Sequence, residues 1–152
     1  ILIGFVAGGV ARGIIVGMLV LITSLFFTEI VIQNIFLTLL VIILTAILFS
    51  LAGLLNAVFA DSFDDINIVP TFILTPLIYL GGVFYSISLL SETWQFISKL
   101  NPVLYMVNAF RYGMLGVSDI NVNFAILMIS FFIIIFYSIS LYILKKGIGI
   151  RD

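Results

Sequence analysis

The stretch FAILMISFFIIIFYSISLYIL, residues 124–144, decides the fold of this chain. It contains 14 Ile, Leu and Phe residues and no charge, and each such side chain favours the centre of a membrane helix by about 0.3 to 0.6 kcal/mol. Because about 20 apolar residues are enough to cross the hydrocarbon core, the stretch predicts a transmembrane helix. Lys145 and Lys146 follow directly and mark its boundary.

The composition of the whole chain agrees with a membrane protein. Of the 152 residues, 64% are hydrophobic and 9% are charged, and the mean hydropathy is +1.41. A soluble domain carries roughly 25% charged residues, so the natural solvent of this chain is lipid. The sequence has no His and no Cys, which excludes zinc–thiolate sites, His-ligated metals and Ser–His or Cys–His hydrolysis. A net charge of −1 gives no sign of a nucleic-acid partner.

The few charges divide the chain into apolar segments. Charge-free runs cover residues 30–60, 66–91 and 120–144, with lengths of 31, 26 and 25 residues. A fourth run, residues 13–28, has only 16 and needs Arg12 or earlier residues to complete a span. We expect Arg12 to snorkel to the interface, since a mid-membrane arginine costs about 2.5–3.5 kcal/mol on insertion scales. The pattern predicts an all-α polytopic membrane protein with four transmembrane helices in a single domain, residues 1–152.

Basic residues predict the orientation. Lys145, Lys146 and Arg151 make the C-terminus the most basic end, which the positive-inside rule places in the cytoplasm. Counting back through four spans puts residues 61–65 inside and residues 86–123 outside. The chain opens in an apolar stretch without an initiator Met or a basic n-region, so we expect a fragment that lacks N-terminal spans.

Small residues predict close helix packing. Gly9, Gly13 and Gly17 recur every four residues, which gives a helix face that another backbone can approach closely. That contact is either internal to one subunit or part of a subunit interface. A second patch lies on the next span, at Ser50, Ala52, Gly53 and Ala57. Asn56, near the end of the same span, is expected to hydrogen-bond to another helix.

The third span carries the helix-breaking residues. We expect it to begin at Pro70, a tolerated first-turn position, and to kink at Pro76, which removes a backbone hydrogen bond. Gly81 and Gly82 then weaken the helix before Phe84 and Tyr85. This pattern predicts a hinge, although glycine and proline are also common in ordinary membrane helices.

The segment after the third span is too long for a turn and too apolar for a solvated loop. Within it, residues 86–116 predict a re-entrant or interface-lying helical hairpin. Ser91 is expected to cap a helix that runs through Leu100, and Asn101 to cap a second helix with Pro102 at its first position. Gly113 and Gly116 are expected to end the second helix. The aromatic residues suited to the headgroup layer are Trp94, Tyr105 and Tyr112.

Only one acidic cluster could support an enzyme. Asp61, Asp64 and Asp65 could hold Mg²⁺ for a diphosphate, but the other acidic residues are expected on the opposite side of the membrane, and no basic group accompanies the turn. A solvated turn that caps the next helix, or a contact with a soluble partner, are the alternatives. Arg111 has no obvious buried acidic partner in the sequence, which disfavours a proton-coupled carrier. No phosphate-binding glycine loop exists in the chain.

The order of several motifs along the chain is distinctive. They are GGVARG at residues 8–13, Phe59-Ala60-Asp61, Pro76-Leu77, GGVFY at residues 81–85, Leu89-Leu90, Trp94, LNP at residues 100–102, Tyr105 and Arg111-Tyr112. This order resembles the permeases of bacterial type-2 ATP-binding cassette (ABC) exporters over nearly the whole chain, most specifically over residues 70–116. The sequence departs from the resemblance at Ser86 and Ser91, where many members place proline.

The resemblance implies a six-span permease of which this chain covers the last four spans. Two permease subunits, in the simplest case a homodimer, would work with separate ATPase subunits that bind ATP and Mg²⁺, so this chain carries no cofactor. The cargo would be a drug, lipid or lipid-linked glycan crossing the bacterial inner membrane. The implied gate or hinge residues are Gly81, Gly82, Phe84, Tyr85, Asn101, Pro102 and Arg111. The implied ATPase-side contacts are Arg12, Asp61, Asp64 and Asp65.

Two alternatives to a transporter subunit remain open at this stage. A Mg²⁺-dependent intramembrane enzyme would use Asp61, Asp64 and Asp65. A non-transporting membrane anchor or assembly factor would show no substrate-dependent stimulation of any partner ATPase.

Overall fold

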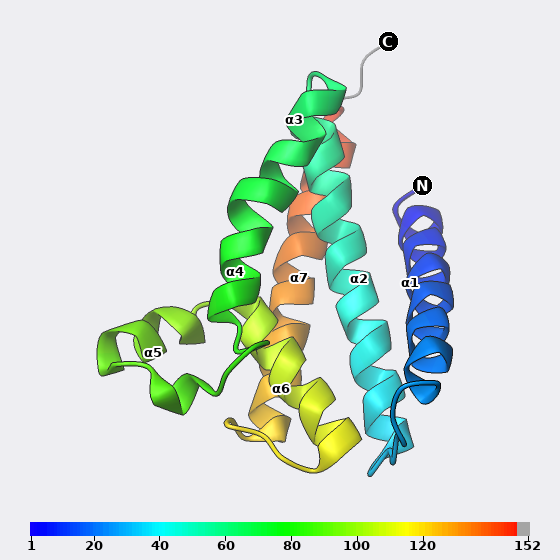
Figure 1. The fold of residues 1–152 in the computed structure, drawn as a ribbon. Coiled ribbons are helices and arrows are strands. Elements are labelled where there is room, and N and C mark those ends of the chain that lie inside the picture. The colour runs from blue at the N-terminus through cyan, green and yellow to red at the C-terminus, as the bar shows by residue number, and fades with distance from the viewer. Residues whose placement is uncertain (149–152) are drawn as a thin grey trace.

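A computed structural model describes residues 1–148. Figure 1 shows a bundle of helices that run roughly along one direction, with shorter helices at one end. In chain order the elements are α1 (Leu2–Leu25), α2 (Ile35–Phe59), α3 (Phe63–Ile68), the π-helix η1 (Val69–Leu74), α4 (Thr75–Leu80), the 3₁₀ turn η2 (Ile87–Leu89), α5 (Glu92–Lys99), α6 (Pro102–Leu115) and α7 (Val122–Lys146). Arg151, the last basic residue of the expected cytoplasmic end, lies outside the described residues.

Four helical segments are long and apolar enough to cross a membrane, which confirms the all-α, four-span prediction. They are Leu2–Leu25, Ile35–Phe59, Phe63–Leu80 and Val122–Lys146. The segment Phe63–Leu80, called the third span below, consists of α3, η1 and α4 in succession. The first span begins at Leu2, so residues before Arg12 complete it, which is one of the two ways predicted, and Arg12 lies inside the helix.

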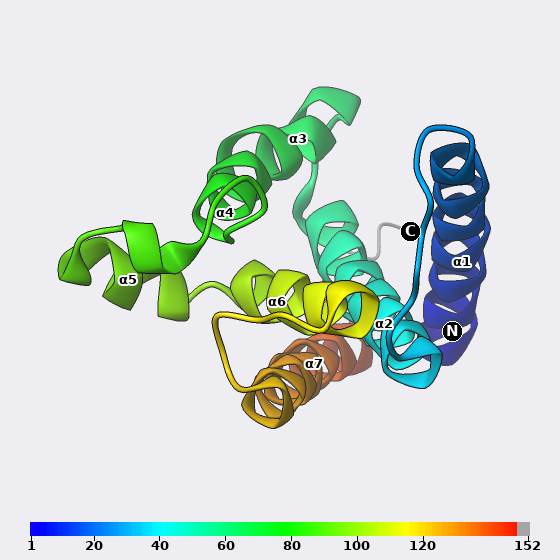
Figure 2. The same cartoon turned by 60° about the horizontal axis from the view of Figure 1, so that its bottom comes forward.

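The core of the bundle lies between α2, α6 and α7. Fully buried side chains from these three helices meet there, among them Val41, Ala109, Ala125 and Ile129. Figure 2 shows α1 beside α2 on one side of this core and the third span on the other. Although α6 has only 14 residues, it packs against α2, α4 and α7. Helix α6 therefore connects the third span to the core.

Small residues bring α1 and α2 together, as predicted, at two of the glycines. A Cβ added at Gly9 would collide with the side chain of Ser50, and one added at Gly13 would lie 3.1 Å from the Cβ of Ala46. The close packing is therefore internal to this chain at these two positions. The other glycines of the helix have open space where a Cβ would be: Gly4, Gly8 and Gly17.

The third span begins earlier than predicted. Ser62, rather than Pro70, starts it, because the Ser62 hydroxyl accepts the backbone N–H of Asp65 at 3.2 Å and the Asp65 carboxylate accepts the N–H of Ser62 at 2.9 Å. This reciprocal capping box satisfies two free donors of the first helical turn. The helix therefore extends seven residues before Pro70.

A stretch of π-helix, Val69–Leu74, contains Pro70 and ends two residues before Pro76. The backbone N–H and the hydroxyl of Thr75 both donate to the carbonyl of Pro70, five residues back. Pro76 has no N–H and cannot donate to a carbonyl four residues back, and a wide turn is one of the recognised ways in which a helix absorbs such a defect. The predicted irregularity at Pro76 thus takes the form of a π segment.

The prediction that Asn56 forms a hydrogen bond between helices is confirmed. Its side-chain amide donates to the carbonyl of Ile66 at 2.8 Å and joins the end of α2 to α3.

The hairpin prediction holds for the two helices but not for every detail. Asn101 caps α6 through the backbone N–H of Val103 at 2.9 Å, with Pro102 at the first helical position. The Ser91 side chain makes no capping bond at α5. Gly113 lies inside α6 and does not end it. A Cβ added at Gly113 would collide with Thr38 of α2, so this glycine allows the two helices to approach closely. The helix ends at Gly116, whose φ is 74°.

Tyr105 also differs from its expected position in the headgroup layer, since its side chain is buried in the core. Its hydroxyl donates to the carbonyl of Lys99 at 2.5 Å and so ties α6 to the end of α5. Burial raises the pKa of Tyr105, which keeps the hydroxyl protonated as a donor.

Candidate functional site

The candidate site lies where the third span ends and its chain turns towards α5. Gly81 caps α4, and its N–H donates to the carbonyl of Ile78 at 3.2 Å. Gly82 follows with a φ of 75°, in the left-handed region that glycine adopts without strain. These two residues reverse the chain within one turn. The short segment from Gly82 to Ser86 is called the hinge turn below.

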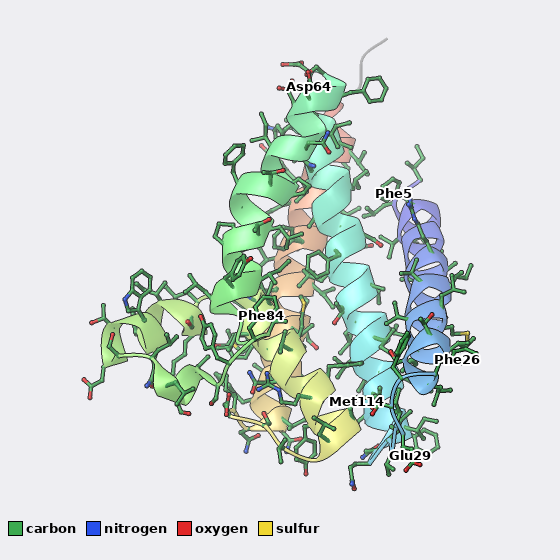
Figure 3. The ribbon with its side chains drawn as sticks, viewed as in Figure 1. Phe5, Phe26, Glu29, Asp64, Phe84 and Met114 are labelled. Atoms are coloured by element: carbon green, nitrogen blue, oxygen red, sulfur yellow. The ribbon has the colours of Figure 1, made fainter. Side chains whose placement is uncertain are left out.

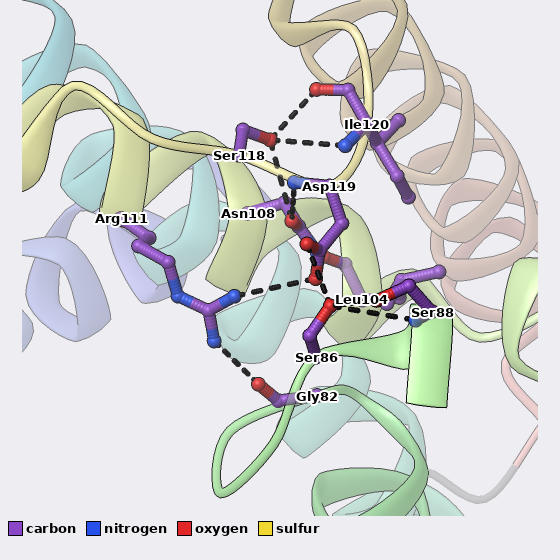
Figure 4. Close-up of polar contacts among 9 residues, drawn as sticks. All are labelled: Gly82, Ser86, Ser88, Leu104, Asn108, Arg111, Ser118, Asp119 and Ile120. Carbon is purple, nitrogen blue, oxygen red and sulfur yellow. Dashed lines mark hydrogen bonds and ion pairs between the residues drawn. The ribbon is translucent and has the colours of Figure 1, made fainter. Parts of the chain in front are cut away.

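Arg111 of α6 holds the hinge turn. One guanidinium nitrogen, Nη2, donates to the carbonyl of Gly82 at 2.5 Å, and the other, Nη1, lies 3.5 Å from the carboxylate of Asp119 (Figure 4). Both side chains are 23% exposed. The sequence showed no obvious buried acidic partner for Arg111, and Asp119 is not a buried one. The loop between α6 and α7 folds back and brings this partly exposed carboxylate to Arg111.

Asp119 connects three segments of the chain. Its carboxylate accepts the hydroxyl of Ser86, at the end of the hinge turn, at 2.7 Å. Its backbone N–H donates to the side-chain oxygen of Asn108 at 2.9 Å (Figure 4). Asn108 is completely buried and donates its amide to the carbonyl of Leu104 at 2.9 Å. A buried amide with both ends bonded fixes the position of its partners, so the loop after α6 is anchored to α6 itself.

Asn101 and Gly81 make a second link between the third span and α6. The Asn101 amide donates to the carbonyl of Leu77 at 2.5 Å, which satisfies one of the unpaired carbonyls in the last turn of α4. A Cβ added at Gly81 would lie 2.8 Å from Cγ1 of Val103. The Asn101-Pro102 start of α6 thus packs directly against the end of the third span.

Phe84 and Tyr85 contact their own span rather than α6. Their partner is Tyr79, whose ring centroid lies 5.4 Å from that of Phe84 and whose carbonyl accepts the Tyr85 hydroxyl at 2.7 Å. Phe84 is 69% exposed, and Figure 3 shows it at the end of the third span away from Asp64. Of the seven predicted gate or hinge residues, the structure therefore brings Gly81, Gly82, Asn101, Pro102 and Arg111 together, and sets Phe84 and Tyr85 on the turn itself.

Sequence reasoning missed Ser86, Asn108 and Asp119 as members of this site. Asn108 lies three residues before Arg111, within the predicted second helix of the hairpin, and Asp119 is the next charged residue after Arg111. An opposite charge eight residues away, beyond a helix end at Gly116, is the one signal that could have indicated the pair. The partner of Ser86, 33 residues away, has no local signal at all.

The acidic cluster of Asp61, Asp64 and Asp65 lies at the opposite end of the bundle from the hinge turn. Figure 3 shows Asp64 at the tip of α3, far from Glu29 and Met114. The Asp65 carboxylate accepts the N–H groups of Asp61 and Ser62 at 3.2 and 2.9 Å, so this cluster caps the third span, as one of the alternatives predicted. Within residues 1–148, no group of three or more His, Cys, Asp or Glu side chains is placed to hold a metal ion.

Arg12 is remote from both ends. Its neighbours Gly9 and Gly13 face Ser50 and Ala46, which lie in the middle of the 25-residue helix α2. The expectation of a boundary position for Arg12 is therefore not met, because α1 continues for ten residues before it. The structure does not bring Arg12 near Asp61, Asp64 or Asp65 as one group.

Comparisons with known proteins agree with this architecture. No solved structure matches the chain. The chain is 52% identical to the inner membrane transport permease YadH of Escherichia coli K12 over 154 aligned residues, which cover all of this chain and 59% of that protein. It is 26% identical to nodulation protein J of Rhizobium leguminosarum bv. viciae over 106 residues, or 70% of this chain and 41% of the relative. The chain thus spans less than two thirds of the length of these relatives.

A family model identifies the chain most directly. The model described as ABC-2 type transporter matches residues 1–115, which include α1, α2, the whole third span and the hairpin up to the end of α6. Together with the permease relative, this match supports a transporter component without enzymatic chemistry and removes the support for a magnesium-dependent enzyme. The chain belongs to the ABC-2 type transporter family.

Proposed function

We propose that this chain is the membrane-spanning part of a permease in an ATP-driven exporter, which moves an amphiphilic molecule across the bacterial inner membrane. The observation that carries the proposal is the third span, which links the acidic turn at one end of the bundle to the hinge turn at the other. A displacement of the acidic turn by a partner would be transmitted along this span to Gly82, Arg111 and the hairpin.

The packing of the third span supports a moving role. None of the residues in α3, η1 or α4 is fully buried, whereas α2, α6 and α7 share a closed core. Elements with few buried contacts open at lower free energy than core elements. The π segment at Val69–Leu74 adds a point of irregular hydrogen bonding inside the same span. The span is thus suited to shift against a stable core.

Partners follow from the family. A separate ATPase subunit would bind ATP and Mg²⁺ and would contact the acidic turn at Asp61, Asp64 and Asp65. Arg12, expected from the sequence to join that contact, lies mid-helix, so we assign it no part in it. A second permease subunit, most simply another copy, would complete the path. The paired lysines Lys145 and Lys146 at the end of α7 support a cytoplasmic C-terminus by the positive-inside rule.

The test uses the full-length permease with its ATPase in proteoliposomes. Arg111→Gln should lower ATP-dependent movement of a fluorescent amphiphile about tenfold, which corresponds to the loss of one charge-assisted hydrogen bond. Gly82→Val should also lower it, because a β-branched side chain is strained at the φ of 75° found there. Both variants should insert into the membrane in normal amount, as measured by extraction and gel filtration.

Normal transport by both variants would overturn the gate assignment. If no amphiphile stimulates the ATPase of the wild-type complex and none is moved, the chain is an anchor or assembly factor instead.

A further inference from the structure

Two asparagine amides tie the third span to the core, one on each side of its π segment. Asn56 of α2 donates to the carbonyl of Ile66 at 2.8 Å, and Asn101, at the start of α6, donates to the carbonyl of Leu77 at 2.5 Å. The π segment, Val69–Leu74, lies between these two contacts. The span therefore cannot slide or rotate as a rigid body without breaking a hydrogen bond to a core helix.

Asn56 supplies a donor that the backbone of the span lacks. Pro70 has no N–H for the carbonyl four residues back, which is that of Ile66. The Asn56 amide donates to this same carbonyl. The proline thus leaves an acceptor free, and α2 uses that acceptor to hold α3 in place.

The π segment contains one residue more than an α-helix needs between the same two bonded groups. The N–H and the hydroxyl of Thr75 both donate to the carbonyl of Pro70, five residues back, the hydroxyl at 3.1 Å. In an α-helix the same N–H would bond to the carbonyl of Thr71, four residues back. Two neighbouring carbonyls therefore compete for one donor, and the Thr75 hydroxyl stabilises the π arrangement. Single π turns within α-helices are frequent at functional sites.

We propose that the π segment is a switch within the third span: in a second state the Thr75 N–H bonds to the carbonyl of Thr71, and α4 and the hinge turn move relative to α3. Loss of the π turn rotates the residues after it by about 100° and shifts them by about 1.5 Å, the values for one residue of an α-helix. A step of this size breaks the hydrogen bond between Arg111 and the Gly82 carbonyl, because such bonds tolerate only a few tenths of an ångström.

The inference deepens the proposed function and rests on it only where the switch serves export. Binding of ATP to the ATPase subunit would drive the change in the span, so the change can be measured without any cargo. A complex that transports while its third span stays unchanged contradicts the switch alone. A complex whose span changes with ATP but that moves no amphiphile contradicts the exporter alone.

Deleting one residue between Pro70 and Thr75 tests the switch. In the full-length permease with its ATPase, deletion of Phe72 leaves Thr75 four residues after Pro70, so the same N–H and carbonyl make an α-helical bond. The helix on either side of the deletion keeps its position. Deletion of Thr71 should act in the same way, because the number of residues matters and not the side chain. Phe72→Ala is the matched control, which removes the side chain and retains the extra residue.

The first measurement is hydrogen exchange of residues 70–78 in lipid nanodiscs, without nucleotide and with ATP and vanadate. The wild type and Phe72→Ala should show a change of at least about threefold in exchange rate when ATP binds, as for a local opening that is populated differently in two states. Both deletion variants should show no change. They should fold, with melting temperatures close to that of the wild type, and should lose ATP-driven transport, whereas Phe72→Ala transports normally.

Three results would overturn the proposal: an exchange rate in the wild type that ATP leaves unchanged, an ATP-dependent change that persists in both deletion variants, or normal transport by these variants. Failure of both deletion variants to fold would also overturn it, because the extra residue would then be part of one fixed structure.

Discussion

Arg111 Nη2 lies 2.5 Å from the carbonyl oxygen of Gly82, so a side chain of α6 holds the turn that ends the third span. The two residues are 29 positions apart, and Gly82 is one of only three residues with positive φ between residues 1 and 148. The hinge turn, at which the third span could change its direction, is therefore also the turn that Arg111 binds to α6.

Arg111 should contribute more to stability than its acidic partner. Loss of the short bond to Gly82 in Arg111→Gln is expected to lower the free energy of unfolding by about 1.5–3 kcal/mol, as for hydrogen bonds to charged groups. Asp119→Asn removes a partly exposed ion pair at 3.5 Å and should cost under about 1 kcal/mol. Thermal unfolding of the detergent-solubilised protein measures both. An equal decrease in the free energy of unfolding for the two variants would show that the ion pair with Asp119, and not the hydrogen bond to the Gly82 carbonyl, accounts for the contribution of Arg111.

Gly82→Ala should affect transport as well as stability, because its φ of 75° strains any L side chain and its new Cβ would lie 3.2 Å from the carbonyl of Tyr85. The expected cost is about 1–2 kcal/mol. Gly147→Ala is the matched control, with a φ of 65° but open space around the Cβ. Both should lower the melting temperature, and only Gly82→Ala should lower ATP-driven transport. Loss of transport in Gly147→Ala as well would remove the special role of the hinge turn.

Gly9→Ala should separate α1 from α2. The added methyl group collides with Ser50, and overpacking of this kind typically costs about 1–3 kcal/mol. Gly8→Ala, one residue away, meets nothing within 4 Å and should be neutral within about 0.5 kcal/mol. Adding Ser50→Gly to Gly9→Ala should recover part of the loss. Thermal stability is the measurement, and similar values for the two glycine variants would contradict the observed helix contact.

Asp65→Ala should loosen the start of the third span, since its carboxylate accepts the N–H groups of Asp61 and Ser62. Loss of a capping residue costs about 1 kcal/mol. Hydrogen exchange of residues 63–68 should accelerate roughly fivefold, which corresponds to that free energy, and Asp64→Ala should change it less. Mg²⁺ should leave the exchange rates unchanged. Protection by Mg²⁺ that depends on Asp61 would revive the metal interpretation.

The spans and the hairpin could be predicted from sequence because their signals are local. The composition of residues 124–144 alone predicts a membrane helix. Asn101-Pro102 predicts a helix start from two adjacent residues, without information from the rest of the chain. The glycine pattern around Gly9 correctly indicated a close contact, although not which glycines would make it.

The polar site could not be predicted because its contacts are not local. Ser86 meets Asp119 across 33 residues, and the pairing depends on how the loop after Gly116 folds back over α6. Tyr105 and Gly113 were misassigned for a related reason. Both lie on a helix that the sequence describes as interfacial, whereas packing against α2 and α7 buries them.

The most direct test of the account asks whether the contact between Ser86 and Asp119 must open during export. Residues 1–152 contain no cysteine. In the full-length permease, with any cysteine outside these residues replaced by serine, Ser86→Cys and Asp119→Cys can be combined and joined by mild oxidation or a short thiol cross-linker. The linked complex in proteoliposomes should lose ATP-driven movement of the amphiphile, and a reductant or a cleavable linker should restore it, while each single variant stays active. Undiminished transport by a fully cross-linked complex would contradict the proposal that the hinge turn is the moving part.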